Sequence, residues 1–231
     1  MSEFTPATLT ILAVIVGYGL GSLPFGLVLT RLFANMDIRK LGSGNIGATN
    51  VLRTGRKELA LLTLLLDGGK GGLAVLIMAA LASSDLASSD LASKDLASTV
   101  LTSGGLAGND IGAIAGFAAV AGHCFPVWLR FKGGKGVATA IATICAIDFL
   151  TGLMMIACWL VVAALFRISS LAALISFFCA VIFGYFYASL TDIQMGVILC
   201  ISALSIARHH ENIRRLMAGE EARISFGKKG S

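Results

Sequence analysis

Charged residues are scarce in this chain. Asp, Glu, Lys and Arg make up 13% of its 231 residues, hydrophobic residues make up 56%, and the mean hydropathy is +0.86. Soluble domains carry about a quarter charged residues, so a water-exposed surface over the whole molecule is excluded. Proline is also rare (3 residues), whereas glycine is abundant (27). Because small residues let membrane helices approach closely, the composition predicts one compact integral membrane bundle, a single domain over residues 1–231.

Several signatures of familiar chemistry are absent. The 5 cysteines form no CxxC pair and mostly lie in apolar runs, so buried, inert thiols are expected and no metal site is predicted. Lys135 is followed by Gly136 and not by Ser or Thr, as a Walker A loop requires, which disfavours a nucleotide triphosphatase. No histidine has an aspartate five residues after it, and this excludes the H-x-x-x-x-D acyltransferase mechanism.

Seven apolar runs alternate with charged segments. A hydrocarbon core of about 30 Å takes about 20 helical residues, so the fourth and fifth runs are short for a full crossing. The first run is too long for a signal-peptide core and no basic residue precedes it, which predicts an uncleaved span. The expected spans are residues 9–33, 59–82, 111–129, 137–150, 152–166, 168–188 and 193–207.

The basic residues are distributed unevenly between the two sides of the membrane. Counting the runs in order places every Lys and Arg except Lys70 and Lys94 on one side. Such a bias marks the cytoplasmic side, so the N-terminus is predicted outside and the C-terminus inside. The net charge of +5 therefore reflects orientation, and no nucleic-acid partner is predicted.

A five-residue repeat, LASSD, follows the second run. Its period matches neither a helix nor a strand, so residues 82–109 are expected to form a low-complexity external loop without chemistry. A short amphipathic helix on the outer surface is the alternative.

The motif GSGNIGATN, residues 42–50, is dense in glycine and short polar side chains and lies between basic residues. Its glycines permit close backbone approach and positive φ. Such a loop can aim several N–H groups at an anion, and a following helix adds a positive dipole end. A plain turn with a helix cap is the alternative. The residues assigned to an anion site here are Gly42, Ser43, Gly44, Asn45, Gly47, Thr49, Asn50 and Arg53.

A second motif, GHCFPVWLRFKGGKGVAT, spans residues 122–139. Lys132 and Lys135 bracket Gly133 and Gly134, and Gly136 follows. Lysine supplies a point charge for phosphate, and glycines expose backbone donors, so phosphate binding is predicted over ordinary basic anchoring. For His123 of this motif, a functional role and a hydrogen bond within the span remain equal alternatives.

The third motif, ARHHENIRRLMAGEE, starts at Ala207. His209 and Asn212 are three residues apart and share a helix face, so together they can hold a hydroxyl and a carbonyl or phosphate oxygen. The alternative, a basic amphipathic tail on anionic lipid, suits Arg214 and Arg215 better.

Asp67 and Lys70 are also three residues apart, within the second run. Charges deep in a bilayer are costly and are usually paired or functional. A structural ion pair that locks the bundle is expected, and contact with substrate is the alternative.

These motifs together resemble the bacterial acyl-phosphate:glycerol-3-phosphate acyltransferase family. DIRKLGSGNIGATN, GHCFPVWLRFKGGKGVAT and RHHENIRRL occur in the right order, and GSLPFG and the Asp67–Lys70 pair also fit. The resemblance covers nearly the whole chain apart from the LASSD segment. It implies a seven-span enzyme of the bacterial inner membrane with its site at the cytoplasmic face. Its substrates would be acyl phosphate and glycerol 3-phosphate, with no cofactor, no metal and no obligate protein partner.

The resemblance also implies residue roles. Ser43, Asn45, Arg53, Lys135, His209 and Asn212 match catalytic positions, and the glycines beside Lys135 match the loop assigned to glycerol 3-phosphate. The hydroxyl proton would pass to His209 or to a substrate phosphate oxygen, while a covalent role for Ser43 is weak because no base lies near it in sequence. A transporter or channel for a phosphorylated solute is the alternative function, although the outer halves of the spans are nearly uncharged.

Overall fold

Helices make up the whole regular structure of the described chain. The computed structural model describes residues 4–90 and 108–224, and within these ranges no strand occurs, which confirms the all-α class. The helices are α1 (Pro6–Gly21), α2 (Phe25–Ala34), α3 (Ala48–Leu52), α4 (Lys57–Asp90), α6 (Gly108–Cys124), α7 (Val137–Ile147), α8 (Phe149–Phe166), α9 (Ser169–Phe186), α10 (Asp192–Arg208) and α11 (His210–Met217), with 3₁₀ turns η1 (Ile38–Lys40) and η2 (Val127–Leu129).

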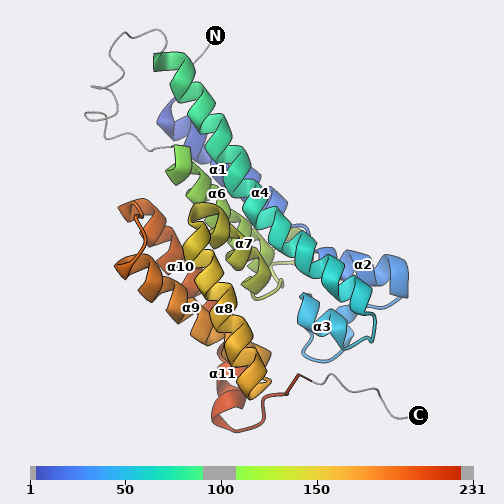
Figure 1. The fold of residues 1–231 in the computed structure, drawn as a ribbon. Helices are drawn as coiled ribbons and strands as arrows, with labels where there is room; N and C mark the ends of the chain where they lie inside the picture. Colours follow the sequence, from blue (N-terminus) through green and yellow to red (C-terminus); the bar gives the residue numbers. More distant parts are fainter. Residues whose placement is uncertain (1–3, 91–107, 225–231) are drawn as a thin grey trace.

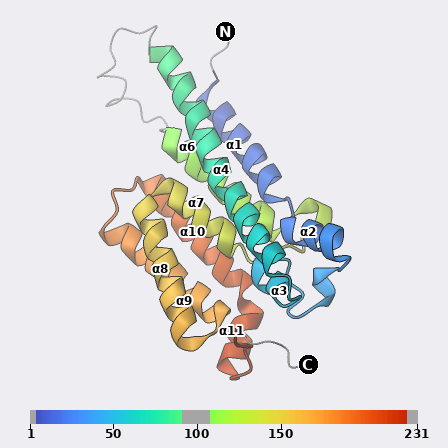
Figure 2. The same ribbon diagram turned by 45° about the vertical axis from the view of Figure 1, so that its right-hand side comes forward.

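The long helices and the shorter α7 form a bundle in which successive helices run in opposite directions (Figure 1). One half contains α1, α4 and α6, and the other contains α8, α9 and α10 (Figure 2). α7 packs on both α4 and α8, and α6 packs on α10. The short helices α2, α3 and α11 all lie toward the same end of the bundle (Figures 1 and 2), so three distant parts of the sequence meet there.

Apolar length divides the helices into two groups. Five segments of the described chain are long and apolar enough to cross a membrane, while α7 is apolar but shorter. The fifth run, expected to be short, forms the 18-residue helix α8. The reason is Asp148, which caps α8 by accepting a hydrogen bond from Thr151 N at 2.7 Å. The five segments are Pro6–Ala34, Lys57–Ser83, Gly108–Leu129, Phe149–Phe166 and Ser169–Phe186.

The first run, expected as one span over 9–33, is broken into two helices. α1 ends at Gly21, and α2 begins after Pro24, whose ring fixes φ and removes a backbone donor. Figure 1 shows α2 turned away from the axis of α1. The carbonyl of Leu23 within the break accepts a hydrogen bond from Lys70 Nζ at 2.8 Å, which ties the break to α4.

The loop predicted over residues 82–109 does not begin at residue 82. α4 continues as a helix to Asp90, because residues 81–90 contain no glycine or proline and alanine and leucine favour helix even without an apolar period. Residues 91–107 of the predicted loop lie outside the described residues.

Small residues set the spacing between helices. A Cβ added to Gly17 or Gly21 of α1 would overlap the carbonyl of Ala115 or Ala119 on α6. A Cβ on Gly71 of α4 would lie 2.6 Å from the carbonyl oxygen of the facing α7 residue. Close backbone approach of this kind drives association of membrane helices, where apolar burial is worth little.

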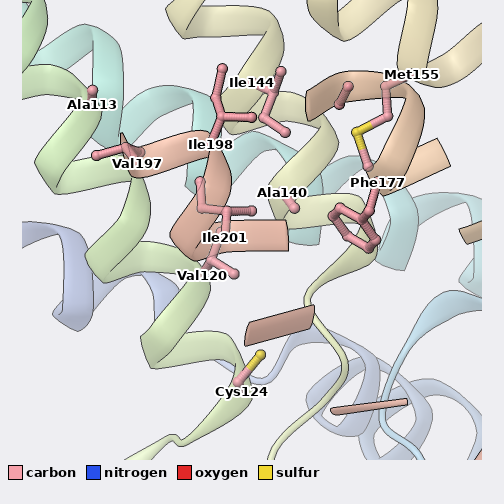
Figure 3. Packing of buried hydrophobic residues seen from close by; sticks show 11 residues of the cluster. Ala113, Val120, Cys124, Ala140, Ile144, Met155, Phe177, Val197, Ile198 and Ile201 are labelled. Atoms are coloured by element: carbon pink, nitrogen blue, oxygen red, sulfur yellow. The ribbon is translucent and has the colours of Figure 1, made fainter. Parts of the chain in front are cut away.

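An apolar core joins the two halves of the bundle. Figure 3 shows side chains from α6, α7, α8, α9 and α10 packed against one another. Cys124 lies at one end of this cluster and is buried, as expected of the thiols, whereas Cys200 is exposed on α10. The cluster consists of Ala113, Val120, Cys124, Ala140, Ile144, Met155, Phe177, Ala180, Val197, Ile198 and Ile201.

Candidate active site

The three glycine- and histidine-containing motifs meet at one end of the bundle. Lys135 Nζ of the second motif donates to Asn212 Oδ1 of the third at 2.5 Å. Thr49 of the first motif has its hydroxyl 3.5 Å from that of Ser169 at the start of α9. Arg208 donates to backbone carbonyls of the second motif. The grouping predicted from charge alone is therefore present in the fold.

Asn50 holds the first motif in shape. Its buried side-chain Nδ2 lies within 3.0 Å of the carbonyls of Ile38, Leu41 and Asn45, and its Oδ1 accepts from Ser43 N at 3.3 Å. These contacts use the amide's hydrogen-bonding capacity. Asn50 therefore braces the loop in this structure, and its contact with substrate stays a prediction.

Several backbone N–H groups of the first motif, which were expected to bind an anion, donate hydrogen bonds within the loop. Besides Ser43 N, Gly44 N donates to Leu41 O at 2.9 Å and Ile46 N donates to Asn45 Oδ1 at 2.9 Å. The polar side chains remain outside the loop, since Ser43, Thr49 and Arg53 are all exposed. The first motif presents side chains to its surroundings more than it presents amides.

The second motif likewise turns its glycine amides inward. Gly133 N donates to Cys124 O at 3.1 Å and Gly134 N donates to His123 O at 3.0 Å. The two amides that were predicted to bind phosphate are thus bonded within the protein. Their carbonyls accept from Arg208, through Nη2 at 3.1 Å and Nε at 3.1 Å respectively. The loop ends at Gly136, whose φ of 81° is strained for any other residue.

Lys135 belongs to a polar network that includes a residue the motifs did not predict, Glu221. Glu221 Oε1 accepts from Asn212 Nδ2 at 2.5 Å and from Ser170 Oγ at 2.7 Å, and Oε2 accepts from Arg215 at 2.6 Å. Burial alone would raise the pKa of the Glu221 carboxyl, but these donors outweigh it and lower the pKa. Burial also lowers the pKa of the Lys135 ammonium.

His209 and Asn212 are both buried, whereas His210 and Glu211 between them are exposed, as the spacing predicts. His209 Nδ1 lies 2.7 Å from Ser205 O. A carbonyl only accepts, so Nδ1 carries the proton and Nε2 has a free lone pair. Burial lowers the pKa of His209 to about 4, with Lys135 contributing in the same direction. The imidazole is therefore neutral at pH 7.

A hollow of about 530 Å³ opens between the first and second motifs. Its cationic side chains come from all three motif regions, while Asp37 lies behind Arg39 and bonds it at 2.6 Å. The hydrogen bond from Arg39, supported by Arg31, holds the pKa of Asp37 well below its usual range. The hollow is lined by Arg39, Gly44, Trp128, Leu129, Arg130, Phe131, Lys132, Gly133 and Arg208.

Of the predicted site residues, Gly44, Lys132 and Gly133 line this hollow. Lys135 and Asn212 lie in the neighbouring network around Glu221. The other predicted residues surround these two regions: Gly42, Ser43, Asn45, Gly47, Thr49 and Arg53 in and beside the first loop, and Gly134, Gly136 and His209 in the second and third motifs.

Two residues that build the site were missed from the sequence. The sequence does mark both residues, since Arg208 lies next to His209 and Glu221 is an acidic residue in a basic tail. They were missed because neither belongs to a glycine-rich motif. Within residues 4–90 and 108–224, no group of three His, Cys, Asp or Glu side chains is placed to hold a metal ion.

Comparison with known proteins decides the family. A family model described as glycerol-3-phosphate acyltransferase matches residues 11–219. The chain belongs to the glycerol-3-phosphate acyltransferase family. This membership confirms the resemblance drawn from the three motifs and identifies the chain as an acyltransferase.

Curated acyltransferases of the family match over almost the whole chain. A glycerol-3-phosphate acyltransferase from Rhodospirillum rubrum is 48% identical, covering 100% of this chain and 98% of the relative. One from Paramagnetospirillum magneticum is 50% identical, covering 99% and 98%.

Solved acyltransferase structures share the fold. A crystal structure of PlsY (YgiH), an integral membrane glycerol 3-phosphate acyltransferase in its glycerol 3-phosphate form, matches with a TM-score of 0.76 and 33% identity over 94% of this chain and 96% of that one. The lysophosphatidic acid form matches with a TM-score of 0.75 and 32% identity, over 94% and 95%. The chain is accordingly a multi-pass membrane protein.

Proposed function

We propose that this chain transfers an acyl group from acyl phosphate to the 1-hydroxyl of sn-glycerol 3-phosphate, giving lysophosphatidate and inorganic phosphate. One observation carries the proposal: the three motifs converge on a cation-lined site at the basic end of an apolar bundle. The names of the family's relatives supply the acceptor. Acyl phosphate as donor is our own assignment.

Both substrates carry a phosphate group, so the site has to hold two anions close together. The cations of the hollow, including Lys132 and Arg208, supply one concentration of positive charge. Lys135, beside Asn212, supplies another. Phosphate binding is assigned to these side chains and to Arg53, because the Gly133 and Gly134 amides are already bonded. Fixed positive charge and positioning provide most of the rate.

The hydroxyl proton has two candidate acceptors, and their pKa values separate them. His209, with a pKa of about 4, is a weaker base than a phosphate monoester, whose second pKa is about 6. The hydroxyl oxygen attacks the acyl carbon, the bond from that carbon to the phosphate oxygen breaks, and the proton passes to a phosphate oxygen. His209 Nε2 does not take this proton; it accepts a hydrogen bond from the other hydroxyl of glycerol 3-phosphate and so orients the substrate.

Ser43 is assigned to substrate contact and not to covalent catalysis. Its side chain is exposed, and within the described residues no base makes a hydrogen bond to its hydroxyl. Asn45, in the same loop, and Arg53, at the end of α3, complete the site. Trapping of an acyl group on Ser43 would contradict this assignment.

The orientation proposed is seven crossings with the N-terminus outside and the site at the cytoplasmic face of the bacterial inner membrane. Support comes from the alternating helix directions and from the basic segments that lie toward one end (Figure 1). α7 has 11 residues and α10 has 17, so these two crossings require a locally thin membrane.

The decisive experiment uses purified protein in lipid vesicles with acyl phosphate and labelled glycerol 3-phosphate. Labelled lysophosphatidate is expected, with equal amounts of phosphate released, and acyl-CoA and acyl-carrier-protein donors serve as controls. Product formed only from acyl-CoA would overturn the donor assignment. Uptake of labelled glycerol 3-phosphate by the vesicles without any acyl donor would instead support the transporter alternative.

A further inference from the structure

A buried charged cluster lies beside the glycine loop. Asp67 and Lys70 form an ion pair at 2.8 Å, with each side chain only 3% exposed. The predicted ion pair is therefore confirmed. His123, from α6, is buried against it. Charge at this depth is costly and marks a function or a partner, and the ion pair explains Asp67 and Lys70 but leaves His123 to be accounted for.

Lys70 uses all of its donors. Its Nζ lies 2.8 Å from Asp67 Oδ1, 2.8 Å from Leu23 O and 2.9 Å from His123 Nδ1. An ammonium has three N–H donors and no acceptor. His123 Nδ1 therefore accepts, and the imidazole proton is on Nε2. The contact fixes both the tautomer and the orientation of the ring.

The opposite edge of the ring faces Gly134. A Cβ added to Gly134 would overlap His123 Nε2 and lie 2.9 Å from two ring carbons. Gly134 N also donates to the carbonyl of His123 at 3.0 Å. Both the ring and the main chain of His123 thus contact Gly134, which is buried.

The loop is held from the other side by Arg208. Its guanidinium donates to both glycine carbonyls, at 3.1 Å each, and lies 5.1 Å from the centre of the Phe125 ring. The residue that follows Gly134 is Lys135, whose ammonium contacts Asn212. Any movement of Gly134 is transmitted directly to Lys135.

We infer that Asp67, Lys70 and His123 form a positioning unit that sets the place of the Gly133–Gly134 loop and hence of Lys135. The inference rests on the proposed function, since it assigns these residues to placement of the phosphate-binding lysine. We assign none of the three to contact with substrate. Glycine is required at position 134 because the locked imidazole leaves no room for a Cβ.

The test is a double-mutant cycle between Gly134→Ala and His123→Asn, read as kinetics with glycerol 3-phosphate and acyl phosphate. In His123→Asn, the Asn oxygen takes the place of Nδ1 as acceptor for Lys70, while the far edge of the ring is lost. Gly134→Ala should lower kcat/KM for glycerol 3-phosphate by on the order of 100-fold, the effect of a displacement of about 1 Å. Adding His123→Asn should restore at least about tenfold of this loss.

Gly133→Ala is the matched control. A Cβ there would meet the carbonyls of His123 and Cys124 and the ring of Pro126, none of which His123→Asn removes. No rescue of Gly133→Ala is expected. Rescue of both glycine variants to the same extent, or of neither, would overturn the inference.

The His123→Asn single variant provides a second readout that does not depend on how Gly134→Ala folds. It should raise KM for glycerol 3-phosphate by about fivefold or more, with a smaller change in KM for acyl phosphate, because the loop loses its support. Unchanged values for both substrates would refute the positioning role. Wild-type protein that is inactive with acyl phosphate would refute the proposed function instead.

Discussion

Arg208 and His209 are neighbours in sequence but act in different surroundings. α10 ends at Arg208, and His209 is its C-cap with φ of −94° and ψ of 10°, so the two side chains leave the helix end in different directions. Arg208 reaches the carbonyls of the glycine loop, whereas His209 turns back to Ser205 O. Arg208 binds the backbone of the glycine loop, and His209 is kept neutral by burial.

His209 gives the protein a pH-dependent stability with a definite sign. Its pKa is about 4 in the fold against 6.5 ordinarily, so between these values the unfolded chain binds the proton more readily. The contribution of neutral His209 to the free energy of unfolding is complete above pH 6.5. It falls by about 3 kcal/mol in total as the pH drops toward 4. The stability difference between wild type and His209→Gln, measured by thermal unfolding in detergent, should shrink from pH 7.5 to pH 5. A constant difference would contradict the low pKa.

Lys135→Ala should raise KM for glycerol 3-phosphate by about tenfold to a hundredfold. Loss of a charge-assisted hydrogen bond of about 1.5–3 kcal/mol predicts this range. Steady-state kinetics give the KM. The melting temperature should change little, because Lys135 lies in a loop and not in the packed core of the bundle. Lys57→Ala, at an exposed position at the start of α4, is the control. An unaltered KM in Lys135→Ala would remove this residue from the site.

At the scale of the helices, glycine positions decide which faces can meet. In DGGKGG the glycine that packs most tightly on α7 is Gly71, where an added Cβ would lie 2.6 Å from both Thr139 O and the Thr143 hydroxyl. A Cβ on Gly69, by contrast, would meet nothing within 4 Å. The same sequence segment therefore contains one glycine required for packing and one that is not. α7 carries the loop with Lys135 at its start, so this contact also supports the site.

Gly71→Val should destabilise the bundle while Gly69→Val should not. Both changes place the same β-branched residue in α4, so differences in helix propensity cancel. Overpacking at the α4–α7 contact costs about 1–3 kcal/mol or more, which should appear as a lower melting temperature in detergent. Equal melting temperatures for the two variants would show that α7 can move away from α4 without cost.

At the scale of the whole molecule, the fold brings together residues from three distant segments. Residues 42–50, 132–136 and 208–221 lie at one end, and the α9–α10 connection lies at the other (Figure 2). The arrangement predicts one-sided exposure. In a cysteine-free background, single cysteines at Ser43, Lys132 and Arg214 should react with a membrane-impermeant maleimide from the cytoplasmic side.

A cysteine at Ser189, in the α9–α10 connection, is the control and should react from the other side. All four positions are exposed, so differences in reactivity report sidedness and not burial. Labelling of positions 43 and 132 from opposite sides in oriented vesicles would rule out a shared site.

Much of this organisation could be predicted because membrane helices are local in character. Each apolar run is recognisable without reference to the others, and the basic bias between runs gives the grouping of the motifs. The continuation of α4 to Asp90 and the break at Pro24 were missed at the level of single elements. There, helix propensity and proline sterics outweighed the repeat and the hydropathy.

The sequence by itself determined the helical class, the membrane environment, the family and the identity of the polar residues that gather at one end, since all of these follow from composition and from motifs along the chain. Only the tertiary structure decided how those residues are used. The inward amides of Gly133 and Gly134, the bracing role of Asn50, and the contacts of Arg208, Glu221 and His123 each depend on partners far away in sequence. A hydrogen bond needs both partners within about 3 Å, and that proximity is a property of the packed bundle.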